Sequence, residues 1–257
     1  MNLIDTHAHL TYPELENQID DVLSRSRSAG VSGWITIGTD RTHNQRAVQL
    51  AQRFDSMFAS VGFHPHHAND VTDDDIAFLE QAAQAEKVVA VGETGLDYHY
   101  DNVVPANQER VFRAHLEIAA RYYKPIIIHT RQAFDDSMAI LAEYRDKIPN
   151  IVIHCYGGDF AQTKFVLDRG YYISFTGTVT FKKSDALREV AKTIPLDRLM
   201  LESDCPYISP EPVRRIQPNE PALIVHTAKC LAGLFNLDLG AFADHLTANS
   251  KRFFALP

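Results

Sequence analysis

The segment Val88-Val89-Ala90-Val91-Gly92-Glu93 is a short apolar run that ends in a carboxylate. An uninterrupted apolar run of this length is typical of a strand buried on both faces, because an exposed face would carry polar residues at alternate positions. Helices must then cover both faces, as they do in a parallel α/β sheet. The segment therefore predicts a parallel sheet in which one strand ends at an acidic side chain.

Similar runs recur along the chain, and an amphipathic segment follows each of them. The expected strands are 3–7, 34–38, 58–63, 88–93, 126–129, 151–154, 171–175 and 199–202. The expected helices are 19–29, 44–54, 74–85, 107–123, 136–144, 160–168, 185–193 and 221–234, with a final helical stretch at 239–253.

This strict alternation of eight strands with eight helices predicts an α/β fold, namely one (β/α)8 TIM barrel with a C-terminal extra helix. We expect residues 1–257 to form a single domain, because no linker or low-complexity run interrupts the alternation. An open doubly wound sheet is the structural alternative. It is weakened because no Gly-x-Gly-x-x-Gly follows the first strand.

The composition limits the classes of protein to which the chain can belong. It is 45% hydrophobic and 23% charged, with a net charge of −8, which argues against a protein that coats nucleic acid through broad electrostatics. No apolar run approaches the roughly 20 residues of a membrane span, and no basic region precedes an apolar N-terminal stretch. We therefore expect a cytoplasmic monomer without a membrane partner. The three cysteines form no CxxC, so we expect no disulfide.

Titratable side chains gather at the predicted strand ends, where (β/α)8 barrels place their active sites. These side chains are His7, His9, His64, Glu93, His129, His154 and Asp204. Residues two apart in a strand point to the same face, so His7 and His9 can meet one cation. A buried histidine taken alone is more often a hydrogen-bonded core residue. Here several strands end in histidines or carboxylates at the same end of the barrel, which favours a metal site instead.

The mixture of ligand types indicates which metals suit this rim. Imidazole suits Zn, Mn, Fe, Ni and Cu, and carboxylates suit Mg, Mn and Ca. Four histidines and two carboxylates are enough for two metals if one carboxylate bridges them. Glu93 is the natural bridge, since its strand lies near the middle of the strand order. Cys155 and Cys205 are expected to be packing residues.

Several of these segments resemble the motifs of the TatD family of metal-dependent hydrolases. The segments are IDTHAHL, GFHPH, VGETGLDY, IIIHTR, IHCYGG and MLESDCPY, and they occur in the family order from residue 4 to about residue 221. The family has an amidohydrolase-like metal site and is associated with Mg- or Mn-dependent deoxyribonuclease activity, while some members carry zinc. One block departs from the family pattern, because extra residues separate Arg214 and Arg215 from the Asn219-Glu220-Pro221 that follows.

The resemblance implies roles for individual residues. His7 and His9 would hold one metal together with Glu93 and Asp204. Glu93 would bridge to a second metal, which His129 and His154 would complete. The implied cofactors are two divalent cations (Mg, Mn or Zn). His64 resembles the family residue that faces the substrate phosphate.

The chemistry of such a site suits hydrolysis of a phosphodiester, and the resemblance implies that the substrate is DNA, in single strands or at 3′ ends. Two cations acidify a bridging water and stabilise charge on the phosphoryl oxygens. Asp204 and Glu93 are the expected catalytic carboxylates, with Asp204 accepting the proton of the attacking water. The expected substrate contacts are His64, Arg131, Lys182 and Asn219. Asp97, Asp5 and Glu202 are candidates to support the ligating histidines or to satisfy backbone groups.

Two other functions remain open at this point. The same barrel can hydrolyse a small phosphoester, a lactone or a cyclic amide, although many such sites bridge their metals through a carboxylated lysine. The fourth strand offers Glu93 and has no lysine inside it, since Lys87 lies at its entry. A non-catalytic metal-binding or scaffold protein is the second alternative, and its sites would be closed by protein ligands.

Overall fold

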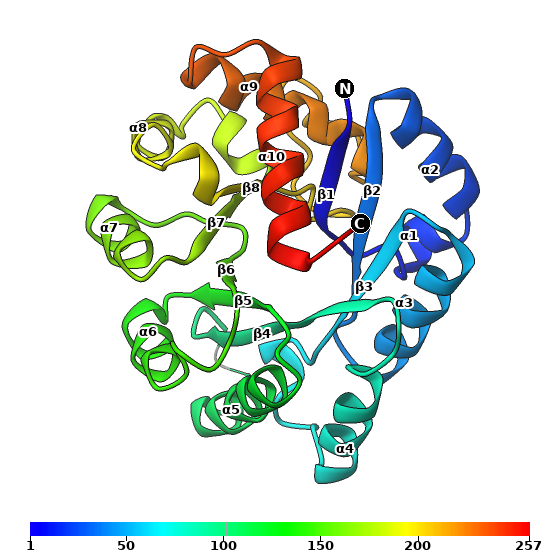
Figure 1. The fold of residues 1–257 in the computed structure, drawn as a ribbon, viewed down its shortest axis with the longest axis vertical. Helices are drawn as coiled ribbons and strands as arrows, with labels where there is room; N and C mark the ends of the chain where they lie inside the picture. Colours follow the sequence, from blue (N-terminus) through cyan, green and yellow to red (C-terminus); the bar gives the residue numbers. More distant parts are fainter. Residues whose placement is uncertain (101) are drawn as a thin grey trace. The chain divides into compact units, whose positions relative to one another are not determined.

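The computed structural model describes residues 1–100 and 102–257. Its described strands are β1 (Leu3–Ala8), β2 (Val31–Ile37), β3 (Met57–Val61), β4 (Val88–Asp97), β5 (Ile126–Arg131), β6 (Ile151–Ile153), β7 (Tyr172–Phe175) and β8 (Leu199–Leu201). They form an eight-stranded sheet in chain order from β1 to β8, and the pairs β3–β4, β4–β5, β5–β6 and β7–β8 are parallel (Figure 1). This order confirms the predicted (β/α)8 barrel.

A helix follows each strand, as the sequence predicts. The helices are α1 (Pro13–Glu16), α2 (Ile19–Ser28), α3 (Arg41–Arg53), α4 (Asp73–Ala82), α5 (Pro105–Arg121), α6 (Phe134–Ala142), α7 (Phe160–Asp168), α8 (Asp185–Ala191), α9 (Ile224–Leu234) and α10 (Leu239–Phe254). Short 3-10 turns are η1 (Pro65–His67), η2 (Gly177–Thr180), η3 (Leu196–Arg198) and η4 (Pro221–Leu223). The prediction missed α1, η1, η2 and η3, which are too short to show a periodic pattern, while η4 lies at the start of the predicted helix 221–234.

Contacts between residues divide the chain into two compact units. One comprises residues 1–35 and 155–257, and the other comprises residues 36–154. Below they are called the terminal unit and the central unit. The single domain expected from the sequence stays a prediction.

In the terminal unit, the first and last strands lie against each other. The Thr6 hydroxyl in β1 donates a hydrogen bond to the Leu201 carbonyl in β8, at 2.9 Å. Helix α10 packs on both strands (Figure 1). The Asn249 amide in α10 donates to the Leu199 carbonyl at 2.8 Å, and the Thr247 hydroxyl donates to the Asn2 carbonyl. Because Asn2 directly precedes β1 and Leu199 begins β8, α10 covers the amino ends of these two strands and leaves their carboxyl ends to the loops.

In the central unit, buried polar side chains fix the β3–β4 region. The Ser60 hydroxyl donates to the Gly92 carbonyl at 2.6 Å. The Asn44 side chain in α3 both donates to the Gly62 carbonyl (2.8 Å) and accepts from the Gly62 amide (2.9 Å). All four residues are buried. These bonds satisfy backbone groups just beyond β3, where the ladder with β4 stops.

Strand β4 is longer than the sequence predicts, because it continues past Glu93 to Asp97. Its register with β5 shifts between Val91 and Thr94, and pairing then resumes as far as Asp97 opposite Arg131. Gly92 and Gly95 lie in this region with φ of 121° and 144°, which other residues rarely adopt. Beyond the register shift the strand therefore continues through Thr94–Asp97, although these residues do not form an apolar run.

No single helix in the described part of the chain is long and apolar enough to cross a membrane. The pair Pro221–Leu234 and Leu239–Phe254 reaches the required length and composition only as two segments bent by 106°.

Candidate metal centre

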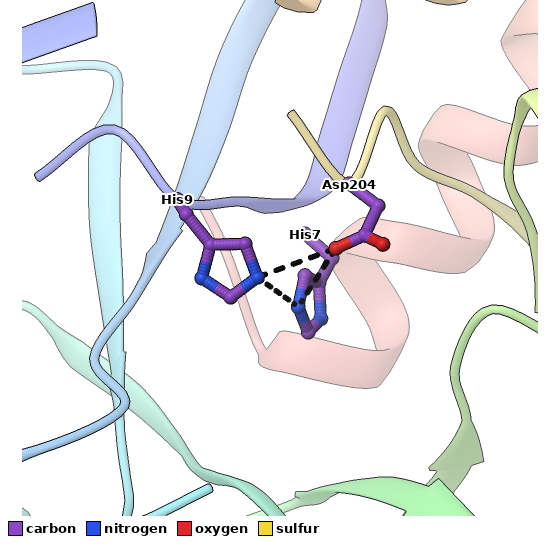
Figure 2. Close-up of side chains that lie close together, drawn as sticks. All are labelled: His7, His9 and Asp204. Atoms are coloured by element: carbon purple, nitrogen blue, oxygen red, sulfur yellow. Dashed lines mark hydrogen bonds and ion pairs between the residues drawn. The ribbon is translucent and has the colours of Figure 1, made fainter. Parts of the chain in front are cut away.

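The terminal unit brings His7, His9 and Asp204 together at the end of β1 (Figure 2). The two Nε2 atoms are 3.3 Å apart, and Oδ1 of Asp204 lies 3.3 Å from Nε2 of His9 and 3.7 Å from that of His7. Figure 2 shows both imidazoles and the carboxylate pointing toward one another. All three residues are buried. Two imidazole nitrogens and one carboxylate oxygen thus converge on a single point.

Backbone hydrogen bonds hold this first ligand group in place. The His9 amide donates to the Cys205 carbonyl at 2.8 Å, and the Asp204 amide donates to the His7 carbonyl at 3.0 Å. Asp204 has a φ of 52°, a left-handed conformation that aspartate tolerates better than most residues. The turn after β8 is therefore tied directly to the end of β1, which sets the position of its carboxylate.

Asp5 and Glu202 satisfy backbone amides beside this group, which is one of the two roles left open by the sequence. Oδ1 of Asp5 accepts from the amides of Ser203 (2.9 Å) and His7 (3.4 Å). Burial raises the pKa of Asp5 to about 7, although its hydrogen bonds to Ser203 and His7 oppose this shift. Oε1 of Glu202 accepts from the amide of Cys155 at 2.5 Å.

The central unit holds a second group of candidate ligands around Glu93. Oε1 of Glu93 lies 2.8 Å from Nε2 of His154, 2.9 Å from Nδ1 of His129 and 3.5 Å from Nε2 of His64. Nδ1 of His129 and Nε2 of His154 are 3.2 Å apart. A single carboxylate oxygen thus faces three imidazoles, and the Glu93 side chain is only 3% exposed.

The glycines of β4 explain how its backbone approaches β5 so closely at Glu93. A Cβ atom added at Gly92 would run into the Ile127 carbonyl, and one at Gly95 would run into the His129 carbonyl. Only glycine fits at these two positions, which lie on either side of Glu93. Glu93 itself lies within the register shift between Val91 and Thr94, so the bulge aims its side chain.

Asp97 contacts His129 from the side opposite Glu93, as expected if Asp97 supports this histidine. Its Oδ2 atom lies 3.0 Å from Nε2 of His129 and 2.8 Å from Nε2 of His66. Burial alone would raise the pKa of Asp97, but hydrogen bonds from His129, the His99 amide and His66 outweigh it and hold the pKa well below its usual range. Asp97 is therefore an acceptor that fixes His129 with Nδ1 toward Glu93.

The pKa of His129 is shifted by its contacts with Asp97 and Glu93. Burial opposes its charged form, but the hydrogen bonds to Asp97 and Glu93 outweigh the burial and raise its pKa. A cation bound at Nδ1 would take the place of the proton that these carboxylates favour.

Two central-unit histidines that sequence reasoning missed support the predicted phosphate contact, His64. His66 donates its amide to Nδ1 of His64 at 3.1 Å, in addition to its bond with Asp97. The Phe63 amide donates to Nε2 of His115 at 2.8 Å, and Nδ1 of His115 donates to the Val111 carbonyl at 2.7 Å. Burial lowers the pKa of His115 to about 4, so it is the neutral form that accepts this bond. His66 could have been found from the sequence, since it is one of three histidines between residues 64 and 67, whereas no such cluster surrounds His115.

The remaining predicted substrate contacts occupy different environments. Arg131 and Lys182 are exposed, in the central and terminal units respectively. The guanidinium of Arg214 lies over the Phe181 ring, 3.9 Å from its centroid. Asn219 is only 1% exposed, and its amide donates to the carbonyls of Ser203 (2.9 Å) and Tyr207. This bond braces the turn that carries Asp204, while a contact of Asn219 with substrate stays a prediction.

Both ligand groups have a composition that fits a divalent metal. The atoms of His7, His9 and Asp204 lie within 4.8 Å of one another, as do those of His64, Glu93 and His129, and both sets combine imidazole nitrogens with a carboxylate oxygen. Nε2 of His154 lies 2.8 Å from Oε1 of Glu93 and so belongs with the second set. Neither group contains a cysteine. Cys205 is fully buried, and burial raises its thiol pKa well above the usual value, as expected for a packing residue.

Comparisons with known proteins agree with this chemistry. The family model for TatD related DNase matches residues 4–255. The uncharacterized metal-dependent hydrolase YabD of Bacillus subtilis (strain 168) is 36% identical over 254 residues, which cover 99% of each chain. The 3'-5' ssDNA/RNA exonuclease TatD of Erwinia billingiae (strain Eb661) is 34% identical over 260 residues, covering 99% of this chain and 100% of the relative.

A solved structure shows the same fold over the same length. The crystal structure of YJJV, a TatD homolog from Escherichia coli K12, superposes with a TM-score of 0.94 at 30% sequence identity. The match covers 99% of this chain and 98% of that one. The chain therefore belongs to the TatD family, and it is an enzyme of the metal-dependent hydrolases.

Proposed function

We propose that the protein is a two-metal phosphodiesterase that hydrolyses DNA, in single strands or at 3′ ends. The observation that carries this proposal is the arrangement around Oε1 of Glu93, which faces His129 and His154 within 3 Å. A carboxylate has two oxygens, so one that lies among imidazole ligands can hold two ions at once. The similarity to relatives named 3'-5' ssDNA/RNA exonuclease TatD supports a nucleic-acid substrate.

We assign His7, His9 and Asp204 to one divalent cation and His129 and His154 to the other, with Glu93 bridging. Bound Mg, Mn or Zn would acidify a water and neutralise charge on the phosphoryl oxygens. Asp204 accepts the proton of the attacking water, because it is a carboxylate held in place by the turn after β8. Glu93 shares this catalytic role as the carboxylate between the histidines.

The remaining groups hold the substrate. His64 faces the phosphate, and Arg131 and Lys182 supply positive charge to a chain whose net charge is −8. Contact with the strand is therefore local and weakens as salt is added. Residues 1–257 acting as one domain, a monomeric state and a cytoplasmic location stay predictions from the sequence.

The test compares substrates and uses matched histidine variants. Metal-reconstituted protein is incubated with labelled single-stranded DNA, duplex DNA, RNA, a small phosphodiester, a lactone and a cyclic amide. We expect metal-dependent shortening of single-stranded DNA, its loss in His129→Ala, and its retention in His245→Ala, which removes an exposed histidine on α10. Turnover of the lactone or amide without cleavage of any phosphodiester would overturn the proposal.

One contact disfavours the lactonase or amidase alternative. The lysine that directly precedes β4 in the sequence, Lys87, donates its ammonium to the carbonyls of Phe54 (3.0 Å) and Asp55 (2.8 Å). Both carbonyls lie ahead of β3, next to the amino end of β4. Lys87 is therefore used as a backbone contact at the end of the strand away from Glu93.

A further inference from the structure

A series of aromatic rings extends outward from Glu93 in the central unit. The ring of His129 lies 4.6 Å from that of His64, which lies 4.3 Å from that of His66. The His66 ring lies 5.1 Å from the Tyr100 ring, in an edge-to-face arrangement at 83°. Tyr100 is 48% exposed. The series therefore joins the candidate metal ligands to an aromatic side chain at the surface.

The guanidinium of Arg131 lies over the ring of Tyr100, the last ring of this series. The guanidinium carbon of Arg131 is 5.4 Å from the centroid of the Tyr100 ring, in a cation–π geometry. Within residues 1–100 and 102–257, the Arg131 side chain makes no ion pair with a carboxylate. Its planar guanidinium carries five N–H donors that can bind a ligand.

The pair of Tyr100 and Arg131 is held by its neighbours. The Tyr98 amide donates to the Arg131 carbonyl at 2.9 Å, which fastens the end of β4 to the end of β5. The His99 ring packs edge-on to Tyr100 at 4.7 Å, and the Gln132 amide lies 3.2 Å from Nδ1 of His99. A surface ordered before a ligand arrives loses less entropy when it binds.

We propose that Tyr100 and Arg131 form a stacking platform for a nucleobase of the substrate strand. This inference rests on the proposed function and names the part of the substrate that the site recognises besides phosphate. Bases stack on aromatic rings and on guanidinium planes whatever the sequence of the strand. Arg131 also offers its positive charge to a backbone phosphate. The platform therefore favours a base-bearing strand over a small phosphoester.

Another exposed tyrosine of the central unit provides a contrast. Tyr123 is 73% exposed and follows α5. Within the described residues it has neither a ring partner nor a cation over its face. Exposure of a tyrosine therefore does not by itself produce the arrangement seen at Tyr100, and Tyr123 serves as a matched control.

The first experiment compares a single-stranded oligonucleotide with a strand of the same length built from abasic tetrahydrofuran units. The measured quantity is the ratio of kcat/KM for the two strands. We expect Tyr100→Ala to lower this ratio by about 5- to 150-fold, mainly through KM, because that is the range of one lost base stack. Tyr100→Phe and Tyr100→Trp restore the ratio, and Tyr123→Ala leaves it at the wild-type value. An unchanged ratio in Tyr100→Ala would overturn the proposal.

A second measurement separates this inference from the proposed function. A strand containing 2-aminopurine is titrated with protein in EDTA, where hydrolysis is stopped. We expect quenching of its fluorescence by wild type and by Tyr100→Phe, and weaker binding without quenching in Tyr100→Ala. If wild type cleaves neither strand but quenches in this way, the platform stands and the proposed reaction fails. If wild type cleaves the strand and Tyr100→Ala quenches as strongly as wild type, the reaction stands and the platform fails.

Discussion

Nε2 of His129 lies 3.0 Å from Oδ2 of Asp97, while Nδ1 of the same ring lies 2.9 Å from Oε1 of Glu93. Asp97 accepts a hydrogen bond from Nε2, so a neutral His129 that binds a metal through Nδ1 keeps its proton on Nε2. The lone pair of Nδ1 is then directed to the side of Glu93. Asp97 thus favours the Nε2-protonated tautomer of His129, which suits metal binding at Nδ1, without itself touching the metal.

Replacing Asp97 should weaken metal binding without removing a ligand. We expect Asp97→Asn to lower the affinity of the Glu93–His129–His154 group by about 10- to 100-fold, because an amide no longer fixes the His129 ring as a charged acceptor does. Equilibrium dialysis followed by mass spectrometry of the metal measures this. Asp135→Asn, the same change at an exposed position of α6, is the control and should bind as wild type does. Equal affinities in the two variants would contradict the prediction.

The two ligand groups should lose their metals separately. We expect two metals per wild-type chain, and one in His7→Ala or His9→Ala, because each replacement removes one imidazole from the same group. His129→Ala should lose the other metal. The stoichiometry is read by mass spectrometry after dialysis, with His245→Ala as the histidine control. A His9→Ala chain that still holds two metals would refute the assignment.

Acid should destabilise the fold through His115. Its pKa is about 4 in the folded chain and 6.5 ordinarily, so between these pH values the unfolded chain binds a proton that the folded chain does not. The free energy of unfolding therefore falls as the pH drops, and His115 contributes a loss of about 3 kcal/mol between pH 7 and pH 4.

The pH effect is isolated by comparing two chains. His115→Gln keeps an acceptor for the Phe63 amide but cannot be protonated. Urea unfolding in EDTA at both pH values gives the change in free energy for each chain, and titrations common to both cancel in the difference. A wild-type loss no larger than that of His115→Gln would show that His115 does not titrate as expected.

Asn219 should act on stability and on the Asp204 turn together. We expect Asn219→Ala to lower the free energy of unfolding by about 1–3 kcal/mol, because the Ser203 and Tyr207 carbonyls lose a buried donor. The affinity of the His7–His9–Asp204 group for metal should fall with it. Urea unfolding and metal titration measure the two effects. A rise in KM for substrate with neither effect would instead identify Asn219 as a substrate contact.

The sequence predicts the parts of this site that depend on local pattern. The apolar run Val88–Val91 identifies a buried strand, and the spacing of His7 and His9 places both rings on one face, which the 3.3 Å between their Nε2 atoms confirms. Each of these inferences uses only residues that are neighbours in the chain. Strand periodicity is sufficient for them.

What the sequence leaves out depends on contacts between distant residues. The end of β4 at Asp97 is set by pairing with Arg131, which the apolar pattern does not encode. The partner of His66 is 31 positions away, and the Phe63 amide that binds His115 is 52 positions away. The burial of Asn219 likewise depends on the carbonyl of Ser203, so its bracing contact appears only in three dimensions.

The terminal unit comes from two separate segments of the chain and the central unit from one, so their candidate metal ligands are completed at different times during synthesis. The ribosome completes every ligand of the Glu93 group once it has made residue 154, and all of them belong to one uninterrupted segment. His7 and His9 emerge first but wait for Asp204, and the helix that packs on β1 is made last. A nascent chain therefore contains one complete set of candidate metal ligands well before it contains the other.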